Sequence, residues 1–448
     1  MSQTDHLTRR EFLTRSAGIG AIGMAAPSIV SAETLGKGAK AAANDRIQLG
    51  FIGVGSRGTA VLKEFLKEPD MEVVAISDAW KQKLDAGIER CGGTPKGYHD
   101  YRELLQDKNV DAVVIETPAH WHTLLGIAAC EAGKDFYVEK PLTMSLAETF
   151  ALRNAVRKHK RLTQVGTQIH AGKNYHRVVD IIRSGILGKI GVVRTQNTMN
   201  QAPNGIGNEP ECDPPEDLDW NLWCGPARKR TFNPTIVKGA YEHQSFMDYS
   251  GGWTPGMAPH IIDLPFWALE LGHPTATSAS GGRYFLQDVG DCYDTHEVLW
   301  QYPNFTLTWR TSMLNAYGVA FPEDEKRHGL AIAFHGTEGT LLTDYDAHSI
   351  IADPDKTPDA SGVPTTNPDP PNHYREFLDC LRSRKQPSCH IDYHYKIDVA
   401  IRLSLMALEL GRTVRFDPET ETIPNDPEAN ALAKPTYRDP WKFPEEYL

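Results

Sequence analysis

The sequence predicts an α/β protein in which a doubly wound parallel sheet precedes a domain built on a largely antiparallel sheet. From residue 46 to about residue 168, strand-like apolar runs alternate with helical patterns, and such repeated β-α units form mostly parallel sheets. After residue 168, β-rich runs follow one another with few helices between them, which is typical of antiparallel sheets.

The first domain is expected to begin with a strand, because Ile47, Leu49 and Phe51 alternate like residues on one face of a strand. A helix over 59–66 follows it, and a second apolar run over 71–78 predicts the next strand. The remaining expected elements are strands at 110–117, 135–139 and 162–166, a helix that runs through 128–129, and a helix over 146–158.

The second domain, residues 169–448, is predicted from short β-rich runs and two late helices. The runs are 190–199, 277–285, 297–301, 306–311 and 330–334, and the helices are 373–383 and 395–411. Between the first two runs, residues 203–236 are rich in Pro, Asp and Asn, so we expect a long surface loop there.

Length and charge exclude several classes of partner. A chain of 448 residues is long enough for two or three domains. The formal net charge of −11 argues against nucleic acid and against anionic membrane surfaces as partners. No apolar run is long enough to span a bilayer, so stable membrane insertion is not expected.

The N-terminus resembles a targeting signal. Residues 8–13, Thr-Arg-Arg-Glu-Phe-Leu, form a twin-arginine signature, and a Gly/Ala-rich stretch leads to a small-residue cleavage site at Val30-Ser31-Ala32. We therefore expect a signal peptide over 1–32, a linker over 33–45, recognition by the twin-arginine export machinery and a periplasmic or otherwise exported protein. The alternative is a disordered basic tail.

A glycine-rich turn follows the first strand and matches G-x-G-x-x-G through Gly53, Gly55 and Gly58. The first glycine allows the tight turn, the second lets the backbone approach a pyrophosphate, and the third lets helix and strand pack closely. Ser56 and Arg57 lie between the second and third glycines, just before the expected helix, whose N-terminal free N–H groups attract phosphate. The motif predicts a Rossmann dinucleotide site, and these five residues are assigned to the cofactor.

Asp78 ends the second strand, 20 residues after Gly58. A carboxylate at this point accepts hydrogen bonds from the adenosine ribose hydroxyls and repels a 2′-phosphate. NAD is therefore favoured over NADP.

Two segments follow later strands, where ligands of such sheets bind. The first runs from Thr117 and Pro118 to His122, and the second is Glu139-Lys140-Pro141. A lysine in this crevice beside a positively charged nicotinamide ring would have a lowered pKa and could deprotonate a hydroxyl. We therefore predict that Lys140 is catalytic, against the alternative of a solvated surface lysine.

His260 and Asp263 are three residues apart and share one face of an expected helix. An imidazole can take a hydroxyl proton while the carboxylate fixes its orientation. A buried structural histidine and a helix-surface pair are the alternatives.

A metal site is an alternative, because His120, His122, His243, His260 and Asp263 could converge. No metal is predicted, since a ligand spacing such as H-E-x-x-H is missing. A serine nucleophile is not expected either, because no G-x-S-x-G follows a strand.

With these motifs in this order, the chain resembles the Gfo/Idh/MocA oxidoreductases, which include glucose–fructose oxidoreductase and inositol dehydrogenase. Further segments match family patterns: Gln164-Val165-Gly166-Thr167-Gln168, Gly251-Gly252 with His260 and Asp263, and Gly336-Thr337-Glu338-Gly339-Thr340. The segments Trp220-Asn221-Leu222-Trp223-Cys224-Gly225-Pro226 and Tyr437-Arg438-Asp439-Pro440-Trp441 resemble its exported, twin-arginine branch.

The resemblance implies an N-terminal Rossmann domain, a C-terminal α/β domain with a large open sheet, NAD(P) across the first domain, and a homo-oligomer. It implies that Lys140 and His260 are the catalytic lysine and histidine. Residues implied to line the cofactor are Thr117, Pro118, His122, Glu139, Lys140 and Gln168.

One departure concerns the family's aspartate four residues before the histidine, which is Gly256 here, while its second glycine is Ala258. Asp263 or Asp248 could substitute for this aspartate.

Three functions follow from these expectations. The first is an NAD-dependent oxidoreductase that acts on a sugar or polyol CH–OH group and keeps its cofactor tightly bound, since the periplasm offers little free dinucleotide. The second is an NAD-dependent glycoside-cleaving enzyme that uses transient oxidation and elimination. The third is a catalytically silent sugar-binding protein.

Overall fold

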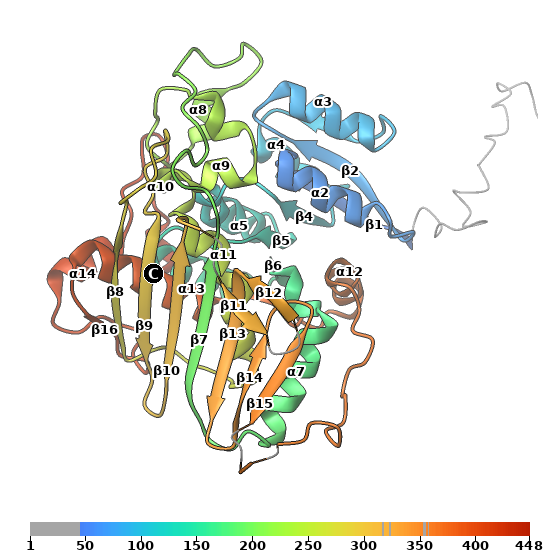
Figure 1. Cartoon of the computed structure of the whole chain (residues 1–448). Coiled ribbons are helices and arrows are strands. Elements are labelled where there is room, and N and C mark those ends of the chain that lie inside the picture. Colours follow the sequence, from blue (N-terminus) through green and yellow to red (C-terminus); the bar gives the residue numbers. More distant parts are fainter. Residues whose placement is uncertain (1–44, 316–317, 322–323, 353–354, 357) are drawn as a thin grey trace, which may run out of the picture. The chain divides into compact units, whose positions relative to one another are not determined.

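The computed structural model describes residues 45–448 except 316–317, 322–323, 353–354 and 357 (Figure 1). The predicted signal peptide and residues 33–44 of the predicted linker lie outside the described residues. Contacts group Ile47–Leu448 into one unit. The domain boundary near residue 168 therefore stays a prediction.

The first sheet confirms the predicted parallel architecture. Its order in the described residues is β3-β2-β1-β4-β5-β6, and each neighbouring pair is parallel. This order reverses between β1 and β4, which is the switch point where doubly wound sheets bind ligands. The strands are β1 Ile47–Ile52, β2 Met71–Ser77, β3 Lys96–Tyr98, β4 Ala112–Ile115, β5 Asp135–Glu139 and β6 Thr163–Gly166.

Helices connect these strands and begin where the sequence supplies capping groups. Asp100 accepts a hydrogen bond from the Arg102 N–H at the start of α4, and Ser145 accepts one from the Glu148 N–H at the start of α6. The helical elements are α2 Ser56–Phe65, α3 Lys81–Arg90, α4 Tyr101–Gln106, η3 Ala119–Trp121, α5 His122–Glu131 and α6 Leu146–His159.

The second sheet is mixed and mostly antiparallel, as predicted. Its order in the described part of the chain is β15-β14-β13-β7-β10-β9-β8-β16, and only the β7–β10 pair is parallel. The strands are β7 Ile190–Thr198, β8 Ala276–Gly282, β9 Thr295–Gln301, β10 Thr306–Ser312, β13 Leu330–Gly336, β14 Gly339–Thr343, β15 His348–Ala352 and β16 Val414–Arg415. A separate antiparallel pair joins β11 Val319–Phe321 to β12 Asp324–His328.

One face of this sheet is covered by helices (Figure 1). The strand β9 alternates buried and exposed residues, and its Val298 and Trp300 belong to the core. The helical elements after β6 are η4 Gln168–Ala171, α7 Lys173–Ser184, α8 Trp220–Cys224, η5 Pro234–Val237, α9 Ala240–Gln244, α10 Met247–Ser250, α11 Trp253–Ala268, α12 His373–Ser383, α13 Ile391–Leu410, α14 Pro427–Leu432 and η6 Glu445–Tyr447.

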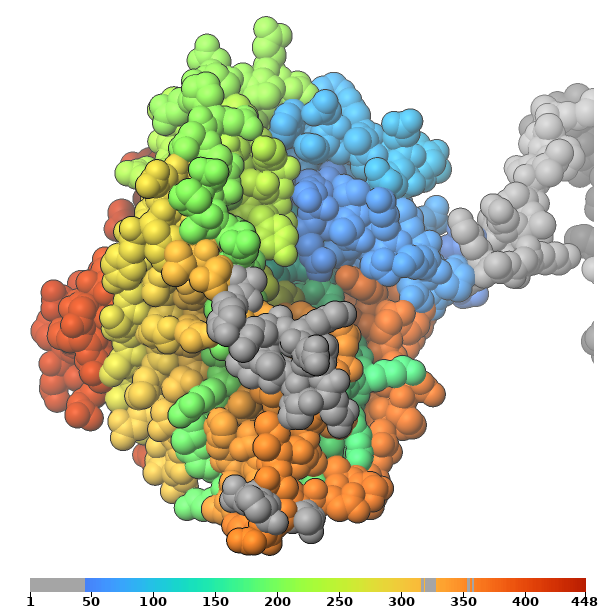
Figure 2. All heavy atoms as spheres, in the orientation of Figure 1, coloured from blue at the N-terminus to red at the C-terminus, as the bar shows by residue number. Residues whose placement is uncertain are grey.

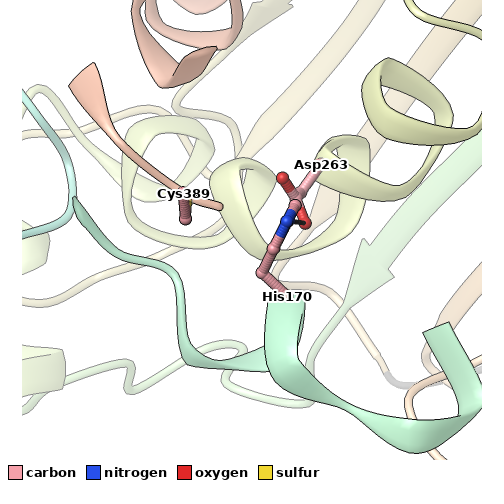
Figure 3. A group of neighbouring side chains, drawn as sticks. All are labelled: His170, Asp263 and Cys389. Atoms are coloured by element: carbon pink, nitrogen blue, oxygen red, sulfur yellow. Dashed lines mark hydrogen bonds and ion pairs between the residues drawn. The ribbon is translucent and has the colours of Figure 1, made fainter. Parts of the chain in front are cut away.

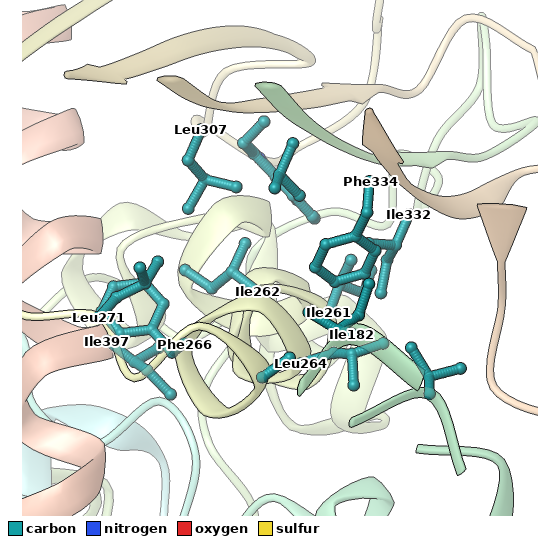
Figure 4. Close-up of a cluster of buried hydrophobic side chains, with 14 of the residues drawn as sticks. Ile182, Ile261, Ile262, Leu264, Phe266, Leu271, Leu307, Ile332, Phe334 and Ile397 are labelled. Atoms are coloured by element: carbon teal, nitrogen blue, oxygen red, sulfur yellow. The ribbon is translucent and has the colours of Figure 1, made fainter. Parts of the chain in front are cut away.

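Helix α11 is buried along most of its length. Its Ile261, Ile262 and Leu264 are fully buried, and they belong to a cluster that also contains Leu307 of β10 and Phe334 of β13 (Figure 4). Contacts on several sides of α11 fix its rotation and position. Any functional group on α11 is therefore held rigidly.

The expectation of a surface loop at 203–236 is corrected by the structure. This region contains α8 and η5, and its Trp220, Phe232 and Ile236 are buried in a cluster of their own. It also contacts the segment between β2 and α3, because Leu218 pairs with Trp80 in an isolated bridge. Figure 2 shows the light-green surface of this part of the chain beside the blue surface of the first domain. The high Pro and Asp content therefore predicted a surface loop where the chain forms a small aromatic core.

Among the described residues, the helices are too short or too polar to cross a membrane.

The glycines of the first turn give a stability prediction. A Cβ at Gly58 would collide with the carbonyl oxygen of Gly53, whereas a Cβ at Gly55 would meet nothing within 4 Å. We expect Gly58→Ala to lower the free energy of unfolding by about 2 kcal/mol, because backbone atoms must move. Gly55→Ala is the matched control and should change it by less than about 0.5 kcal/mol. Urea denaturation measures both, and equal losses would contradict the close helix–strand contact.

Candidate active site

A cavity lies at the carboxyl edge of the first sheet, around the switch point between β1 and β4. Residues that directly follow four strands line it: Gly53 after β1, Asp78–Trp80 after β2, Glu116–Ala119 after β4, and Lys140 and Pro141 after β5. The opposite wall comes from α8, η5 and α9 and the residues beside them. It consists of Leu222, Trp223, Ile236, Val237, Gly239, Ala240, His243 and Gln244. The cavity is therefore enclosed by parts of the chain far apart in sequence.

The glycine-rich turn has the geometry of an anion site. Gly53 has φ +88°, and a Cβ there would lie 2.9 Å from backbone atoms of Glu116 and Thr117. Helix α2 begins at Ser56 after Gly55, and no side chain of the described part of the chain caps it. Its first N–H groups and the open space beside Gly55 are thus available to a phosphate.

Asp78 is held by two backbone groups at the edge of the cavity. Its Oδ2 accepts a hydrogen bond from the Val54 N–H and its Oδ1 accepts one from the Trp80 N–H, both at 2.9 Å. Burial raises the pKa of the Asp78 carboxyl above its ordinary value. The carboxyl therefore links the glycine turn to the end of β2.

Glu139 organises the end of β5. Its Oε1 accepts hydrogen bonds from Arg57 Nε at 2.7 Å and from Gln168 Nε2 at 2.8 Å. Its Oε2 accepts one from the Lys140 N–H at 2.9 Å. One buried carboxylate thus ties α2, η4 and the predicted catalytic lysine together.

Lys140 connects the first sheet to helix α11. It precedes Pro141 across a cis peptide bond, and its Nζ donates a hydrogen bond to the Gly256 carbonyl oxygen at 2.9 Å. Burial lowers the pKa of Lys140, since it disfavours the charged amine. A lysine whose pKa is lowered gives up its proton more readily and can exchange a proton with a hydroxyl.

His260 lies one helical turn after Gly256 on α11, so the two residues share a face of the helix. Burial and the positive charge of Lys140 lower the pKa of His260 well below its usual value. The imidazole is therefore neutral at physiological pH and can accept a proton.

Gln244 fills the space beside Gly256. A Cβ at position 256 would overlap the Gln244 Oε1. The Gln244 Nε2 donates a hydrogen bond to the Ala240 carbonyl oxygen at 2.9 Å, while its Oε1 is buried and has no hydrogen-bond partner among the described residues. A neutral amide therefore occupies the place where a longer side chain at 256 would project.

Asp263 pairs with a different imidazole from the one expected. Its carboxylate is fully buried and forms hydrogen bonds with His170 Nδ1 at 2.8 Å and with Tyr393 Oη at 2.7 Å. The expected Asp263–His260 pair is thus replaced by an Asp263–His170 pair. Asp248, the other suggested substitute, forms ion pairs with Arg228 and Arg230 instead.

His170, Asp263 and Cys389 form a buried group whose donor atoms lie within 4.8 Å of one another (Figure 3). Two ligands of a tetrahedral zinc ion lie about 3.3 Å apart, given bonds of about 2.0 Å. The 2.8 Å separation of His170 and Asp263 is shorter and is that of a hydrogen bond. Burial also raises the pKa of the Cys389 thiol, which keeps it protonated. The group is therefore interpreted as a hydrogen-bonded cluster.

The other histidines weighed as metal ligands face backbone carbonyls. His120 Nε2 lies 3.0 Å from the Trp223 oxygen, and His243 Nδ1 lies 3.2 Å from the Gly239 oxygen. His122 lies between the Thr117 and Pro141 carbonyl oxygens, 2.7 Å from each. His122 therefore ties the ends of β4 and β5 together.

The structure gathers most of the predicted cofactor residues around one cavity. Those that line it are Gly53, Gly55, Ser56, Arg57, Asp78, Thr117, Pro118, Glu139 and Lys140. Three others do not line the cavity but contact residues that do. Gly58 packs on Gly53, His122 forms a hydrogen bond with the backbone of Thr117, and Gln168 forms one with Glu139. Within the described chain, His260 and Asp263 do not belong to the lining of this cavity.

Sequence reasoning missed Glu116, which lines the cavity directly after β4. The signal that identified Asp78, an acid at the end of an apolar strand, was present here too. Gln244 carried no such signal, because nothing in a short helical segment indicates that its amide reaches Gly256.

Two family models match parts of the chain. A family model described as an oxidoreductase family with an NAD-binding Rossmann fold matches residues 47–167. A second model, described as the C-terminal alpha/beta domain of an oxidoreductase family, matches residues 307–443.

Similar proteins include glycosidases and sugar dehydrogenases. A glycosyl hydrolase family 109 protein of Shewanella pealeana is 30% identical over 203 residues, which are 41% of this chain and 44% of that protein. The chain thus spans less than half the length of that relative.

Two solved structures share the fold. The WlbA dehydrogenase from Bordetella pertussis, in complex with NADH and UDP-GlcNAcA, is 17% identical with a TM-score of 0.62, covering 83% of this chain and 98% of that one. A levoglucosan dehydrogenase in complex with NADH and levoglucosan is 17% identical with a TM-score of 0.60, covering 85% of this chain and 100% of that one.

Proposed function

Because the chain belongs to the Gfo/Idh/MocA family of oxidoreductases, with an NAD-binding Rossmann domain and a C-terminal α/β domain, we propose that it oxidises or reduces a sugar or polyol at a CH–OH carbon. The observation that carries this proposal is the position of Lys140. Its amine lies in the cavity that begins at the glycine turn and is fixed by Gly256 of the buried helix α11.

The residues present fit a dinucleotide. The space beside Gly55 is open where a pyrophosphate would approach the uncapped start of α2. Asp78 lines the same cavity at the end of β2 and would accept hydrogen bonds from the adenosine ribose, which favours NAD over NADP. When bound, NAD supplies a hydride donor or acceptor at its nicotinamide ring.

Lys140 and His260 supply the proton chemistry of the proposed reaction. A CH–OH group that loses hydride must also lose its hydroxyl proton, and a base within reach must accept it. Lys140, which lines the cavity and whose pKa burial lowers, is the proposed acceptor, and His260, one helical turn after Gly256 but outside the cavity lining, is proposed as a second acid–base group. In the reverse direction the same groups return the proton.

The far wall of the cavity suits a carbohydrate. Trp223 offers an aromatic surface on which a sugar ring can pack, and Gln244 belongs to the same wall. The solved neighbours bound to UDP-GlcNAcA and levoglucosan support a sugar substrate.

Redox-neutral cleavage of a glycoside is the second candidate function. It is supported by the similarity to glycosyl hydrolase family 109 proteins and by the neutral Gln244 amide beside Gly256. Transient oxidation of one sugar carbon acidifies the neighbouring C–H, a base removes that proton, and the leaving group departs with the electron pair. Addition of water and return of the hydride complete the cycle with no net redox change.

Lys140→Met tests the proposed chemistry, because it keeps the length of the side chain and removes the amine. We expect turnover to fall about 1000-fold, since a positioned acid–base group contributes roughly 10²- to 10⁴-fold. NADH affinity should change only a few-fold. The measurement follows absorbance at 340 nm with a panel of hexoses and polyols, and aglycone release from p-nitrophenyl glycosides. The exposed Lys67→Met is the matched control and should behave like the wild type.

The products separate the candidate functions. Net NADH formation supports the dehydrogenase, and aglycone release without NADH supports the glycosidase. Sugar binding without turnover, unchanged by Lys140→Met, would instead indicate a catalytically silent protein and would overturn the proposal.

Export by the twin-arginine route and assembly into a homo-oligomer are also proposed. Export rests on the motif at residues 8–13, and it would favour a tightly held cofactor because the folded protein carries it across the membrane. Replacing both Arg9 and Arg10 with Lys should retain the protein in the cytoplasmic fraction. Unchanged periplasmic recovery would contradict the proposed route. Sedimentation velocity tests assembly, and a monomeric mass would contradict it.

A further inference from the structure

Two sequence motifs with no part in the proposed chemistry contact each other in the structure. The first, residues 220–226, contains helix α8, and the second, residues 437–441, belongs to the segment 437–448. Arg438 of the second motif makes the contact. Its backbone N–H donates a hydrogen bond to the Pro226 carbonyl oxygen at 2.9 Å. The fold thus brings together two motifs that are far apart in the sequence.

The Arg438 guanidinium binds the end of helix α8. Its Nη2 donates hydrogen bonds to the carbonyl oxygens of Gly225 at 2.8 Å and of Asn221 at 3.0 Å, and its Nε donates one to that of Ala227 at 3.2 Å. Its Nη1 donates a fourth to Asn221 Oδ1 at 2.8 Å. The last carbonyl groups of a helix lack partners within the helix, and the planar arginine fork can satisfy several of them at once. One side chain therefore fixes the turn that ends α8.

Two tryptophans extend this contact to the first domain. The Arg438 guanidinium lies 4.7 Å from the centre of the Trp441 ring, and the Trp441 ring meets the Trp121 ring edge to face, with 5.8 Å between their centres. Trp121 lines the cavity, and its Nε1 donates a hydrogen bond to the Trp223 carbonyl oxygen at 3.0 Å. A Cβ at Gly225 would collide with the Trp121 ring, so α8 packs closely against this tryptophan.

The segment 437–448 is itself anchored on the first domain. Tyr437 Oη donates a hydrogen bond to Glu148 of α6. Tyr447 Oη donates one to Glu131 of α5 at 2.9 Å, and the Tyr447 carbonyl oxygen accepts one from Asn154 Nδ2 of α6 at 2.8 Å. The segment is therefore a fixed support that connects α8 to the helices of the first domain.

Helix α8 depends on such contacts because it is short. A helix of five residues has few hydrogen bonds of its own and is not stable in isolation. Two of its residues, Leu222 and Trp223, line the cavity. The position of this wall is therefore set by side chains outside the helix, and Arg438 donates four of the side-chain hydrogen bonds that hold it.

We propose that Arg438 is a positioning residue, which acts through α8 to hold the Trp223 indole where it packs on the sugar ring. Within the described chain, residues 437–441 do not belong to the lining of the cavity, so Arg438 acts on the substrate through Trp223 alone. This inference rests on the proposed function, because it requires a sugar in this cavity. It gives the motif at 437–441 a part in substrate recognition and leaves the proton chemistry at Lys140 unchanged.

Hydrogen exchange and steady-state kinetics on matched variants test the proposal. Arg438→Ala removes the four side-chain hydrogen bonds, and Arg438→Lys keeps the charge without the planar fork. Arg412→Ala is the matched control, since Arg412 forms its hydrogen bonds with Asp426 and Glu428 at the start of α14 instead. Exchange is followed by mass spectrometry in peptides that cover residues 219–226, with α7 as the internal reference. Kinetics use the hexose, polyol or p-nitrophenyl glycoside that the wild type turns over fastest.

Arg438→Ala should raise KM for this sugar about five- to tenfold, the loss expected when an aromatic contact is misplaced. The value of kcat should change less than about twofold, because contacts made equally to substrate and transition state affect KM. Amides of residues 219–226 should exchange about tenfold faster, and those of α7 should not change. Arg438→Lys should fall between the wild type and Arg438→Ala, and Arg412→Ala should match the wild type in KM and in exchange at α8.

A double-mutant cycle with Trp223→Ala separates positioning from a general loss of stability. If Arg438 acts through the Trp223 indole, the two substitutions are not additive. Arg438→Ala should then raise KM no further in the protein that already carries Trp223→Ala.

Two kinds of result would overturn the positioning role. Unchanged KM in Arg438→Ala would show that the sugar does not depend on this contact. Additive effects of the Arg438 and Trp223 substitutions, or an equal rise of KM in Arg412→Ala, would assign Arg438 to overall stability. A wild type that neither binds nor turns over any sugar would overturn the proposed function itself. That outcome is distinct, because faster exchange at α8 in Arg438→Ala would still show that Arg438 holds the helix.

Discussion

The hydrogen bond from Lys140 Nζ to the Gly256 carbonyl oxygen is the contact on which the architecture of the site depends. It joins the end of β5 in the first sheet to helix α11, which is embedded in the core of the second domain. Because α11 is packed on several sides, the lysine gains a rigid anchor from a part of the chain more than a hundred residues away. The amine is thereby held in the cavity with its charge disfavoured by burial.

A second set of contacts sets the shape of the cavity floor. Glu139 binds Arg57 and Gln168, and His122 lies between the carbonyl oxygens that follow β4 and β5. These side chains hold strand ends at defined positions around the switch point. The glycine turn, in contrast, leaves open space, because none of the described residues lies within 4 Å of a Cβ built at Gly55. Rigid polar support surrounds a space that the backbone leaves open, which suits the recognition of a large anionic cofactor.

Sequence patterns predicted the first domain well because its signals are local. The alternation at Ile47–Phe51, the three glycines and the acid at Asp78 each determine one step of a β-α-β unit, and the observed parallel sheet agrees with the prediction made from them. The three-residue strand β3, Lys96–Tyr98, was missed because it has no apolar run. The region 203–236 was misjudged because its few buried aromatics are separated by polar and proline residues.

Contacts between segments that are distant in the sequence could not be predicted from the sequence. The spacing of His260 and Asp263 correctly indicated a shared helix, but the carboxylate partner is His170 from η4, which only the tertiary fold brings close. The overlap of Gln244 with the space beside Gly256 is of the same kind. Glu116 differs, since its place after an apolar strand can be seen in the sequence, whereas its lack of a hydrogen-bond partner among the described residues cannot.

A crystal structure of the protein grown with NAD⁺ tests the central claim most directly. The account predicts that the pyrophosphate contacts the first N–H groups of α2 beside Gly55 and that the nicotinamide ring lies next to the Lys140 amine. A dinucleotide bound elsewhere, or one bound here with its ring turned away from Lys140, would contradict it.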